Sequence, residues 1–283
     1  MGRLSRISTR ITTLSENTAG RTNLLAEWGL SMLVEADGYK ILLDTGLSFS
    51  AAYNAITLGI DLSRIDKIVF SHGHFDHTGG LLYILKMVKG KVEVIAHPDV
   101  WAPKYAKRPQ QSVEYIGVPF SKEAAEALGA SFNLTKEPVW INESIVTSGE
   151  IPMITEYEEI DHDLYVKEKD KLKPDPLWDD QALFLKSEKG LIIVLGCAHR
   201  GVINTIRHAQ RLTEVKPVYA VIGGTHLVSA SPQGMHSTVA ELLSFGIQKL
   251  GVSHCTGLPA AAILAQTFGK AFFFNNAGTR IEL

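Results

Sequence analysis

Three histidines and an aspartate fall within six consecutive positions of "SHGHFDHTGG", residues 71–80. On a loop that leaves a strand, His72 and His74 can face one point, while Asp76 and His77 face a neighbouring point. Imidazole and carboxylate ligands together suit Zn²⁺, Mn²⁺ or iron. The stretch therefore predicts a site for divalent metal. The alternative is a polar loop whose histidines only hydrogen-bond one another.

Other residues capable of chemistry stand where short apolar runs end. The runs are rich in β-branched residues and are typical of buried strands. They end at Asp44, His72, His97, Cys197 with His199, His226 and His254. Helix-like segments lie between many of them, at about 49–59, 78–89, 201–213, 235–246 and 259–268. This alternation predicts a layered α/β fold. Because strand carboxyl ends converge on one edge of such a sheet, we expect these residues to meet in one cleft.

The start and the middle of the chain depart from this alternation. "TRITTLSEN" and "GLSMLVEADGYKILLDTG" predict antiparallel strands with a turn at "ADGYK". Residues 98–178 are less regular and hold a predicted helix at "SKEAAEALGA", N-capped by Ser121, and a charged stretch. Long irregular insertions are usually lids, binding loops or disordered segments. We expect one domain over residues 1–283 in which 98–178 covers the cleft or makes a dimer contact, with a plain solvated surface as the alternative for its charged part.

Composition and charge narrow the class of protein. The net charge of −2 gives no electrostatic case for nucleic acid or an anionic membrane as a partner. No apolar run has the length of a membrane helix, and the basic start "MGRLSRISTRITTL" lacks the apolar stretch of a secretory signal. The only cysteines are Cys197 and Cys255, far apart in sequence. We expect a cytoplasmic protein. Its expected partner is a small-molecule substrate, with no nucleic acid or membrane, and a homodimer is a candidate assembly.

Several of these motifs together resemble the metallo-β-lactamase superfamily. Its signature of two histidines, an aspartate and a histidine has the spacing seen in residues 71–80, "ILLDTG" matches its strand-end aspartate, and "VSHCTG" matches its last histidine. The resemblance spans nearly the whole chain except 98–178. It implies a four-layer αββα sandwich with one or two divalent ions at its edge, zinc first, with manganese or iron as alternatives. The ligands it implies are His72 and His74 for the first ion, and Asp76, His77 and His254 for the second. Asp44 would orient a ligand, as carboxylates behind metal ligands do.

Two positions depart from the family pattern. The place of the usual third histidine of the first metal holds Asp179 and Asp180, and the place of the metal-bridging aspartate holds Cys197. We expect His199 to supply the missing imidazole, against the alternative of a helix-start residue without a metal role. Cys197 is either a thiolate ligand, since metal binding deprotonates a thiol, or a buried structural cysteine. Asp180 is a further candidate, as a ligand or as the support of one.

The stretches "GCAHRGVINT", "GGTHL", "SHCTG" and "NLLAEWGLSMLVE" resemble one branch of the superfamily. Its members are described as metal-dependent hydrolases, and they include an archaeal transferase, 7,8-dihydropterin-6-yl-methyl-4-(β-D-ribofuranosyl)aminobenzene 5′-phosphate synthase. This resemblance implies a metal-dependent hydrolase or transferase that acts on a small phosphorylated or pterin-like substrate. The alternatives are a thioester or lactone hydrolase of the same superfamily and a non-enzymatic module that senses a metal or ligand.

Three further residues are candidates for substrate contact or proton transfer. His226 follows a strand and two glycines, which favours contact with a substrate anion or proton transfer, against a structural role. Thr225, with backbone N–H groups of the same loop, could bind a phosphate. Glu27 is a weaker candidate for substrate contact, against an ordinary strand-end residue. We expect Asp76 or His226 to carry the catalytic proton. The remaining histidines, His97, His162, His208 and His236, are assigned to structure or surface.

Replacement of both His72 and His74 by alanine tests the metal site directly. The double variant loses two of the ligands of the first ion, so we expect metal binding to be abolished. The measurement is the metal content of the purified protein by elemental analysis. Full metal content in the double variant would contradict the assignment.

Overall fold

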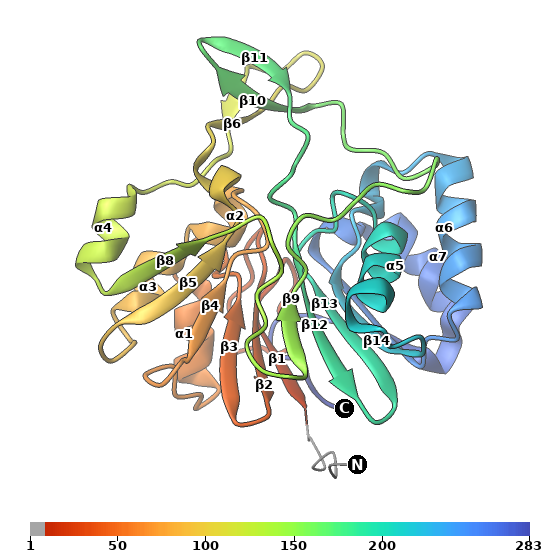
Figure 1. Ribbon diagram of the computed structural model, residues 1–283, viewed down its shortest axis with the longest axis horizontal. Helices are drawn as coiled ribbons and strands as arrows, with labels where there is room; N and C mark the ends of the chain where they lie inside the picture. The colour runs from red at the N-terminus through yellow and green to blue at the C-terminus, as the bar shows by residue number, and fades with distance from the viewer. Residues whose placement is uncertain (1–8) are drawn as a thin grey trace.

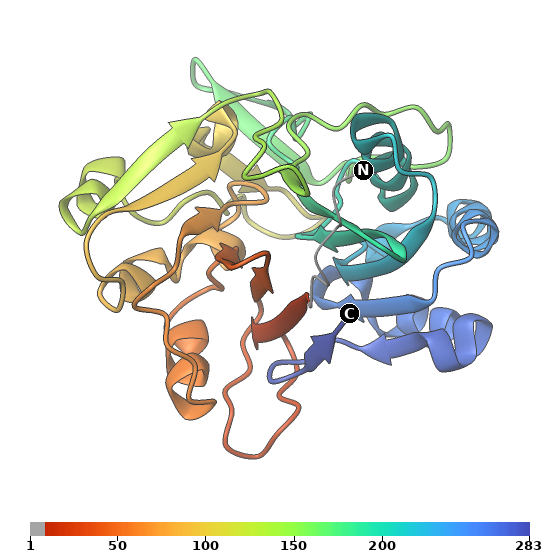
Figure 2. The same cartoon turned by 60° about the horizontal axis from the view of Figure 1, so that its bottom comes forward.

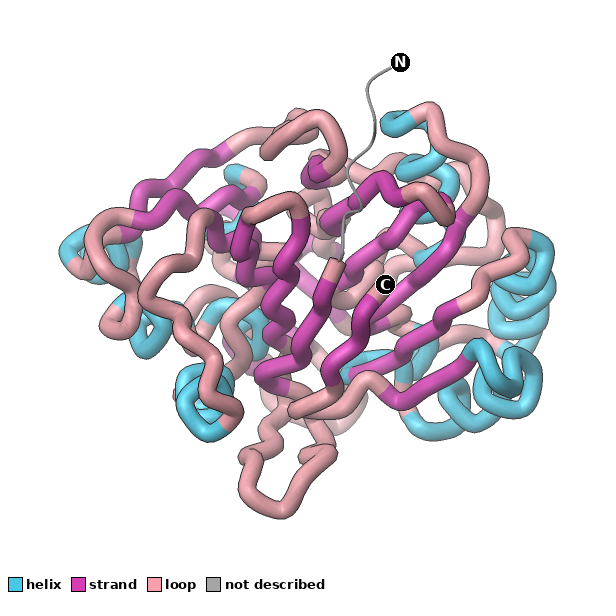
Figure 3. Tube along the Cα trace, turned by 90° about the horizontal axis from the view of Figure 1, so that it is seen from below, coloured by secondary structure: helices cyan, strands magenta, loops and turns pink. Residues whose placement is uncertain are grey.

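Two β-sheets packed face to face form the centre of the molecule, and helices cover the outer face of each (Figure 1). The computed structural model describes residues 9–283. Residues 1–8 of the predicted domain lie outside the described part. They hold much of the basic start "MGRLSRISTRITTL", so the expectation that this start is not a secretory signal falls largely on residues that the structure does not describe. The predicted αββα sandwich is confirmed. Figure 2 and Figure 3 show the same layers from below, with helices outside the strands.

The first sheet has seven strands in the order β17-β1-β2-β3-β4-β5-β8. Its members are β1 (Arg10–Ser15), β2 (Ser31–Ala36), β3 (Tyr39–Leu43), β4 (Lys67–Val69), β5 (Val92–Ala96), β8 (Ala130–Leu134) and β17 (Arg280–Glu282). β1, β2 and β3 pair antiparallel, as predicted, whereas β3, β4, β5 and β8 run parallel. The parallel strands therefore end at one edge of the sheet.

The second sheet has six strands in the order β16-β15-β14-β13-β12-β9. Its members are β9 (Ile145–Thr147), β12 (Ala182–Ser187), β13 (Gly190–Leu195), β14 (Val218–Gly224), β15 (Lys249–Ser253) and β16 (Phe272–Phe274). β13 to β16 run parallel, and β12 pairs antiparallel with both β13 and β9. The strand ends that carry Cys197, His226 and His254 are therefore neighbours, as the cleft prediction requires.

β13 illustrates why these strands read as unbroken apolar runs. Its residues Leu191, Ile193 and Leu195 pack in the apolar cluster under the helices, whereas Ile192 and Val194 pack in the cluster between the two sheets. A strand that is covered on both faces has no position for a polar side chain. For the same reason, the polar residues follow the strands at the edge of the sheet, outside the apolar core.

The helices lie where the sequence places them, with one exception. α1 (Ser50–Thr57), α3 (Leu81–Leu85) and α4 (Lys122–Ala127) cover the first sheet, and α5 (Val202–Thr213), α6 (Pro232–Ser244) and α7 (Leu258–Phe268) cover the second. Short 3₁₀ turns are η1 (Pro98–Trp101), η2 (Leu227–Ser229), η3 (His254–Thr256) and η4 (Gly269–Ala271). In the described part of the chain, no helix combines the length and the apolar character needed to cross a membrane.

The exception is the helix expected over about 78–89. Of this range only Leu81–Leu85, in α3, is regular helix, and a separate short helix, α2 (Phe75–Thr78), precedes it. Gly79 and Gly80 separate the two, and a Cβ atom there would lie 2.1 Å and 2.0 Å from carbonyl oxygens of the loop after β3. Such contacts are closer than any side chain allows. The two glycines therefore let the metal loop and the loop after β3 pass each other closely.

Region 98–178 supplies parts of three different sheets. Its β8 and β9 complete the edges of the two main sheets, whereas β6 (Lys104–Ala106), β7 (Glu114–Tyr115), β10 (Leu164–Glu168) and β11 (Lys171–Pro174) form a separate four-stranded sheet. This small sheet stands above the sandwich (Figure 1, top). Ser121 caps α4, as predicted, by accepting a hydrogen bond from the backbone N–H of Ala124. The single-domain assignment stays a prediction.

A buried ion-pair cluster ties the small sheet to the metal loop. Lys104 of β6 is 1% exposed, and its Nζ lies 2.8 Å from Asp175 Oδ2 and 2.9 Å from Asp179 Oδ1. Asp179 Oδ2 also accepts a hydrogen bond of 2.8 Å from the backbone N–H of Gly73. Gly73 separates His72 from His74, so the position of both rings depends on this cluster.

Lys104→Met tests this connection. The substitution leaves two carboxylates buried without their cation, and loss of one member of a buried ion pair costs about 3–5 kcal/mol. We expect a loss of that order in the free energy of unfolding, measured by denaturant titration of the metal-free protein. The control is Lys122→Met, whose exposed pair with Glu126 is worth less than about 1 kcal/mol. Equal stability of the two variants would show that the cluster does not hold the loop.

Candidate metal centre

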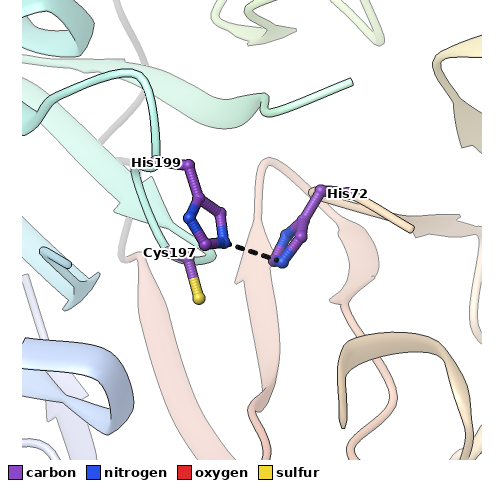
Figure 4. Close-up of side chains that lie close together, drawn as sticks. All are labelled: His72, Cys197 and His199. Carbon is purple, nitrogen blue, oxygen red and sulfur yellow. Dashed lines mark hydrogen bonds between the residues drawn. The ribbon is translucent and has the colours of Figure 1, made fainter. Parts of the chain in front are cut away.

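The first ligand group joins the two sheets. His72 Nε2 lies 2.9 Å from His74 Nδ1 and 3.3 Å from His199 Nε2. The Sγ atom of Cys197 lies within 4.8 Å of ligand atoms of both His72 and His199. Figure 4 shows the rings of His72 and His199 facing each other, with the sulfur of Cys197 beside them. His199 thus stands where an imidazole was expected.

The second ligand group lies next to the first and shares Cys197 with it. His77 Nε2 lies 3.2 Å from His254 Nε2 and 3.1 Å from Cys197 Sγ. Asp76 Oδ2 lies 3.2 Å from His254 Nε2. The five residues expected from the family pattern, with His199, therefore gather at one edge of the sandwich. Cys197 stands between the two groups, in the place expected for a bridging ligand.

The carboxylate of Asp44 sets the orientation of two rings. Its Oδ1 accepts a hydrogen bond from the backbone N–H of Ser71, and its Oδ2 accepts from Ser71 Oγ and His77 Nδ1, each at 2.7 Å. Since the hydroxyl hydrogen of Ser71 points to Asp44, Ser71 Oγ accepts from His72 Nδ1, 2.9 Å away. Both rings therefore carry their proton on Nδ1 and present a bare Nε2 to the centre.

His254 is oriented in the same way by the loop after β1. Its Nδ1 lies 2.9 Å from Asn17 Oδ1, and its backbone N–H donates to Glu16 Oε1 at 2.7 Å. With Nδ1 as the donor, its Nε2 also lacks a proton. The Nε2 atoms of His77 and His254 face each other at 3.2 Å, so a cation has to lie between them. That cation is a second proton on His77, whose pKa is raised to about 9, or a metal ion that replaces it, so this donor set fits a metal ion.

Ser71, Glu16 and Asn17 were not among the residues expected from the sequence. Ser71 gave one usable signal, because it stands directly before the first histidine at the end of a strand. The other two gave none: Glu16 meets the backbone of a residue 238 positions away.

Burial and neighbouring charges shift the pKa values of the histidines in the two ligand groups. Burial, with the neighbouring charges, places the pKa of His72, His74 and His199 well below its usual range, so these rings are neutral. Burial also lowers the pKa of His77, but the charges of Asp44 and Asp76 outweigh it and raise that pKa to about 9. His72, His74 and His199 can therefore bind a metal ion as neutral imidazoles, whereas His77 must first release a proton.

His226 is held next to the centre. Its Nε2 lies 2.9 Å from Asp161 Oδ2, and its ring centroid lies 4.0 Å from that of His199. Its Nδ1 is buried and has no hydrogen-bond partner among residues 9–283. Burial lowers the pKa of His226, but Asp161 and Cys255 outweigh it and raise that pKa to about 10. Thr225 lies beside it and donates a hydrogen bond of 3.0 Å from Oγ1 to Thr256 Oγ1.

Glu27 is engaged elsewhere. Its Oε1 accepts hydrogen bonds from the backbone N–H groups of Leu47 and Ser48 and from Ser50 Oγ, at the start of α1. Of the described cavities, none is lined by Glu27. This geometry gives Glu27 a structural task and does not favour the expected substrate contact.

A cavity of about 550 Å³ opens onto both ligand groups. Its lining includes His74, Asp76, Cys197, His199 and His254 from the centre, with His226 beside them. Arg108, Glu114, Ile116, Asp161 and Leu164 also line it, and all belong to region 98–178. A smaller cavity of about 140 Å³ lies next to it, lined by Thr225, His226, Ser229 and Ser231. Both volumes suit small molecules or parts of them.

Similarity to known proteins identifies the family of this chain. The sequence model of the metallo-beta-lactamase superfamily matches residues 29–200. The chain belongs to the metallo-β-lactamase superfamily. It is 34% identical to the 7,8-dihydropterin-6-methyl-4-(beta-D-ribofuranosyl)-aminobenzene-5′-phosphate synthase of Methanocaldococcus jannaschii, over 96% of each chain.

Solved structures agree with this placement. Tm1679, described as a metal-dependent hydrolase of the beta-lactamase superfamily, is 25% identical and superimposes with a TM-score of 0.82, covering 97% of this chain and 99% of its own. A diphosphatase of the PhnP family is 13% identical with a TM-score of 0.57, covering 97% of this chain and 98% of its own, and it shares the fold.

Asp180 stands apart from the ligand groups of this metallo-β-lactamase centre. Its Oδ2 accepts a hydrogen bond of 2.9 Å from the backbone N–H of Arg200, directly after His199. Burial raises the pKa of Asp180 to about 7. Among residues 9–283, the groups that could hold a metal do not include it. Its position supports the turn that carries His199.

Cys197→Ala, compared with Cys255→Ala, separates the two interpretations of Cys197. Both thiols are buried and line the same cavity, but Cys197 belongs to both histidine-containing groups at the centre, whereas Cys255 belongs only to a third group, with Cys197 and His226. We expect Cys197→Ala to weaken metal affinity about tenfold or more, and Cys255→Ala to leave it within about threefold. Metal content after dialysis against a graded chelator measures both. Equal affinities would assign Cys197 to structure.

Proposed function

We propose that this member of the metallo-β-lactamase superfamily is a metal-dependent enzyme for a small phosphorylated or pterin-like substrate, acting as a transferase or a hydrolase. The observation that carries the proposal is the pair of neighbouring ligand groups that share Cys197 and line one cavity of about 550 Å³. The proposed ligands are His72, His74 and His199 for one ion and Asp76, His77 and His254 for a second, with Cys197 between them. Bound there, a divalent ion such as zinc, or alternatively manganese or iron, would lower the pKa of a water molecule and polarise the electrophile.

The groups around the centre have the chemistry to move protons. Although burial raises it, the neighbouring histidines hold the pKa of Asp76 well below its usual range, so the carboxylate is ionised and can accept a proton from the nucleophile. His226 carries a proton on Nε2 toward Asp161 and has a raised pKa, so its ring can hold an anion or protonate a leaving group. Asp76 can thus act as the proton acceptor and His226 as the proton donor that a displacement reaction requires.

Two cationic side chains on the cavity wall are candidates to bind an anionic substrate. Arg108 and His226 line the same space as the ligand groups, each beside a carboxylate, that of Glu114 and that of Asp161. Phosphate groups bind well to such cations, because their oxygens accept several charge-assisted hydrogen bonds. Thr225 lines the neighbouring smaller cavity but donates its hydroxyl hydrogen to Thr256, so the hydroxyl of Ser231 in the same cavity is the better donor for one phosphate.

The choice of substrate class is supported by the archaeal relative. The name of that synthase contains both a dihydropterin and a 5′-phosphate, and the alignment covers 96% of both chains. As a transferase, this enzyme would admit a dihydropterin as the nucleophile in place of water. As a hydrolase, it would cleave a phosphorylated substrate with water. We further propose a cytoplasmic location, where Cys197 and Cys255 stay reduced, and no nucleic-acid or membrane partner. Homodimerisation stays a prediction.

The second candidate is a module that senses a metal or ligand without turnover. Cys197 in the place of the bridging aspartate favours it, because a thiolate between two ions binds them tightly without offering an acid–base group. Measurements of turnover by the metal-loaded protein decide between the enzyme and the sensor.

His226→Gln tests the enzyme proposal, with His236→Gln on the exposed side of α6 as its control. The glutamine cannot carry the proton, so we expect kcat to fall about 100-fold or more with unchanged metal content. The assay follows a generic phosphodiester, a thioester and a dihydropterin with a phosphorylated acceptor, before and after chelation and reloading with zinc or manganese. We expect activity to be lost on chelation and restored on reloading. Full metal content with no turnover of any of these substrates would contradict the enzyme and favour the sensor.

A further inference from the structure

A second cavity, which we call the annex, adjoins the metal cavity on the side of His254. Its volume is about 390 Å³. Trp28, Val228 and His254 line both cavities, so the annex and the metal cavity share a wall at one of the proposed metal ligands. A molecule that is held in the annex therefore lies next to the centre.

The annex is walled by large apolar side chains that are accessible to water. Trp28 is 57% exposed, Phe274 is 51% exposed, and Leu258, at the start of α7, is 81% exposed. The three residues come from the loop after β1, from β16 and from α7, and they meet around one cavity. Exposed apolar side chains that gather around a hollow are typical of ligand-binding sites, because a ligand removes them from water.

One polar atom in this wall lacks a partner. Ser253, at the end of β15, is 6% exposed, and its Oγ has no hydrogen-bond partner in the described part of the chain. A buried hydroxyl without a partner costs free energy, so a ligand atom that bonds to it is favoured. Two other polar residues of the lining, Glu16 and Asn17, hold His254 by its backbone N–H and its ring. The annex thus combines apolar walls with a buried hydroxyl that has no partner in the described part of the chain.

We propose that the annex binds a flat aromatic or nitrogen-heteroaromatic ring of the substrate, while the phosphorylated part lies in the metal cavity. Trp28, Leu258 and Phe274 form the apolar walls, and Ser253 Oγ bonds to a polar edge of the ring. Aromatic side chains favour such a ring because they offer large contact areas at defined geometry. This inference rests on the proposed function and specifies which end of the substrate binds where.

The binding of pterin to the metal-loaded protein tests the annex. Leu258→Glu places a carboxylate on its wall, at the first position of α7, where a negative charge suits the helix N-terminus. The control is Ile263→Glu on the same helix, at a position that is 45% exposed and lines neither the annex nor the metal cavity. We expect pterin affinity, measured by calorimetry, to fall tenfold or more in Leu258→Glu and less than twofold in Ile263→Glu. Metal content and affinity for inorganic phosphate should be unchanged in both.

Ser253→Ala adds a test of the polar contact. It removes the hydroxyl without adding bulk, and we expect a severalfold loss of pterin affinity with unchanged phosphate affinity. Equal pterin affinity in the wild type, Leu258→Glu and Ser253→Ala would overturn the annex, and so would a wild type that does not bind pterin at millimolar concentration. Either result leaves metal-dependent turnover of phosphorylated substrates standing. Conversely, pterin binding that Leu258→Glu abolishes, in a protein without turnover, would support the annex and contradict the enzyme.

Discussion

The metal centre depends on one buried carboxylate, that of Asp44 at the end of β3. It accepts a hydrogen bond from His77 directly and fixes His72 through the hydroxyl of Ser71. One charge thus decides which nitrogen of two rings is free to bind a metal. Asp44 itself has a φ of 58°, in the left-handed region that aspartate tolerates better than most residues. The bend at this strand end turns its side chain into the centre.

The centre exists only when the two sheets are packed together. The first sheet and its loops supply His72, His74 and His77, whereas the second supplies Cys197, His199 and His254. The apolar cluster between the sheets, which includes Leu43, Val69 and Val194, holds the two sets in register. The buried histidines lose hydration on folding, and a metal ion bound between them would offset this loss. Metal binding and the packing of the sandwich would then stabilise each other.

The sequence predicts the sandwich and the gathering of the strand-end residues, because apolar runs that end in polar residues are a local pattern. The position of His199 beside the other histidines was expected as well, because the third histidine of the family pattern is absent from its usual place. Glu16, Asn17 and Lys104 could not be found in this way, because each acts through a contact with a residue distant in sequence. Region 98–178 was predicted as irregular because several of its strands are not buried apolar runs: β8 is only partly buried, and β11 is exposed along its whole length. The helix expected over 78–89 is shorter than predicted, because regular helix covers only Leu81–Leu85, after a turn at Gly79 and Gly80. The metal ligands and the single-domain assignment stay predictions.

Both cysteines of the chain line the metal cavity, and each is a free thiol. They are 58 positions apart in sequence, yet Cys255 Sγ lies 3.5 Å from the carbonyl oxygen of Cys197. Chemical selectivity follows from this placement. A small thiol-directed label that reacts with the folded protein has no other cysteine to modify, so every cysteine adduct it forms lies beside the proposed metal ligands. The centre can therefore be marked, blocked or given a spectroscopic probe without changing a single residue.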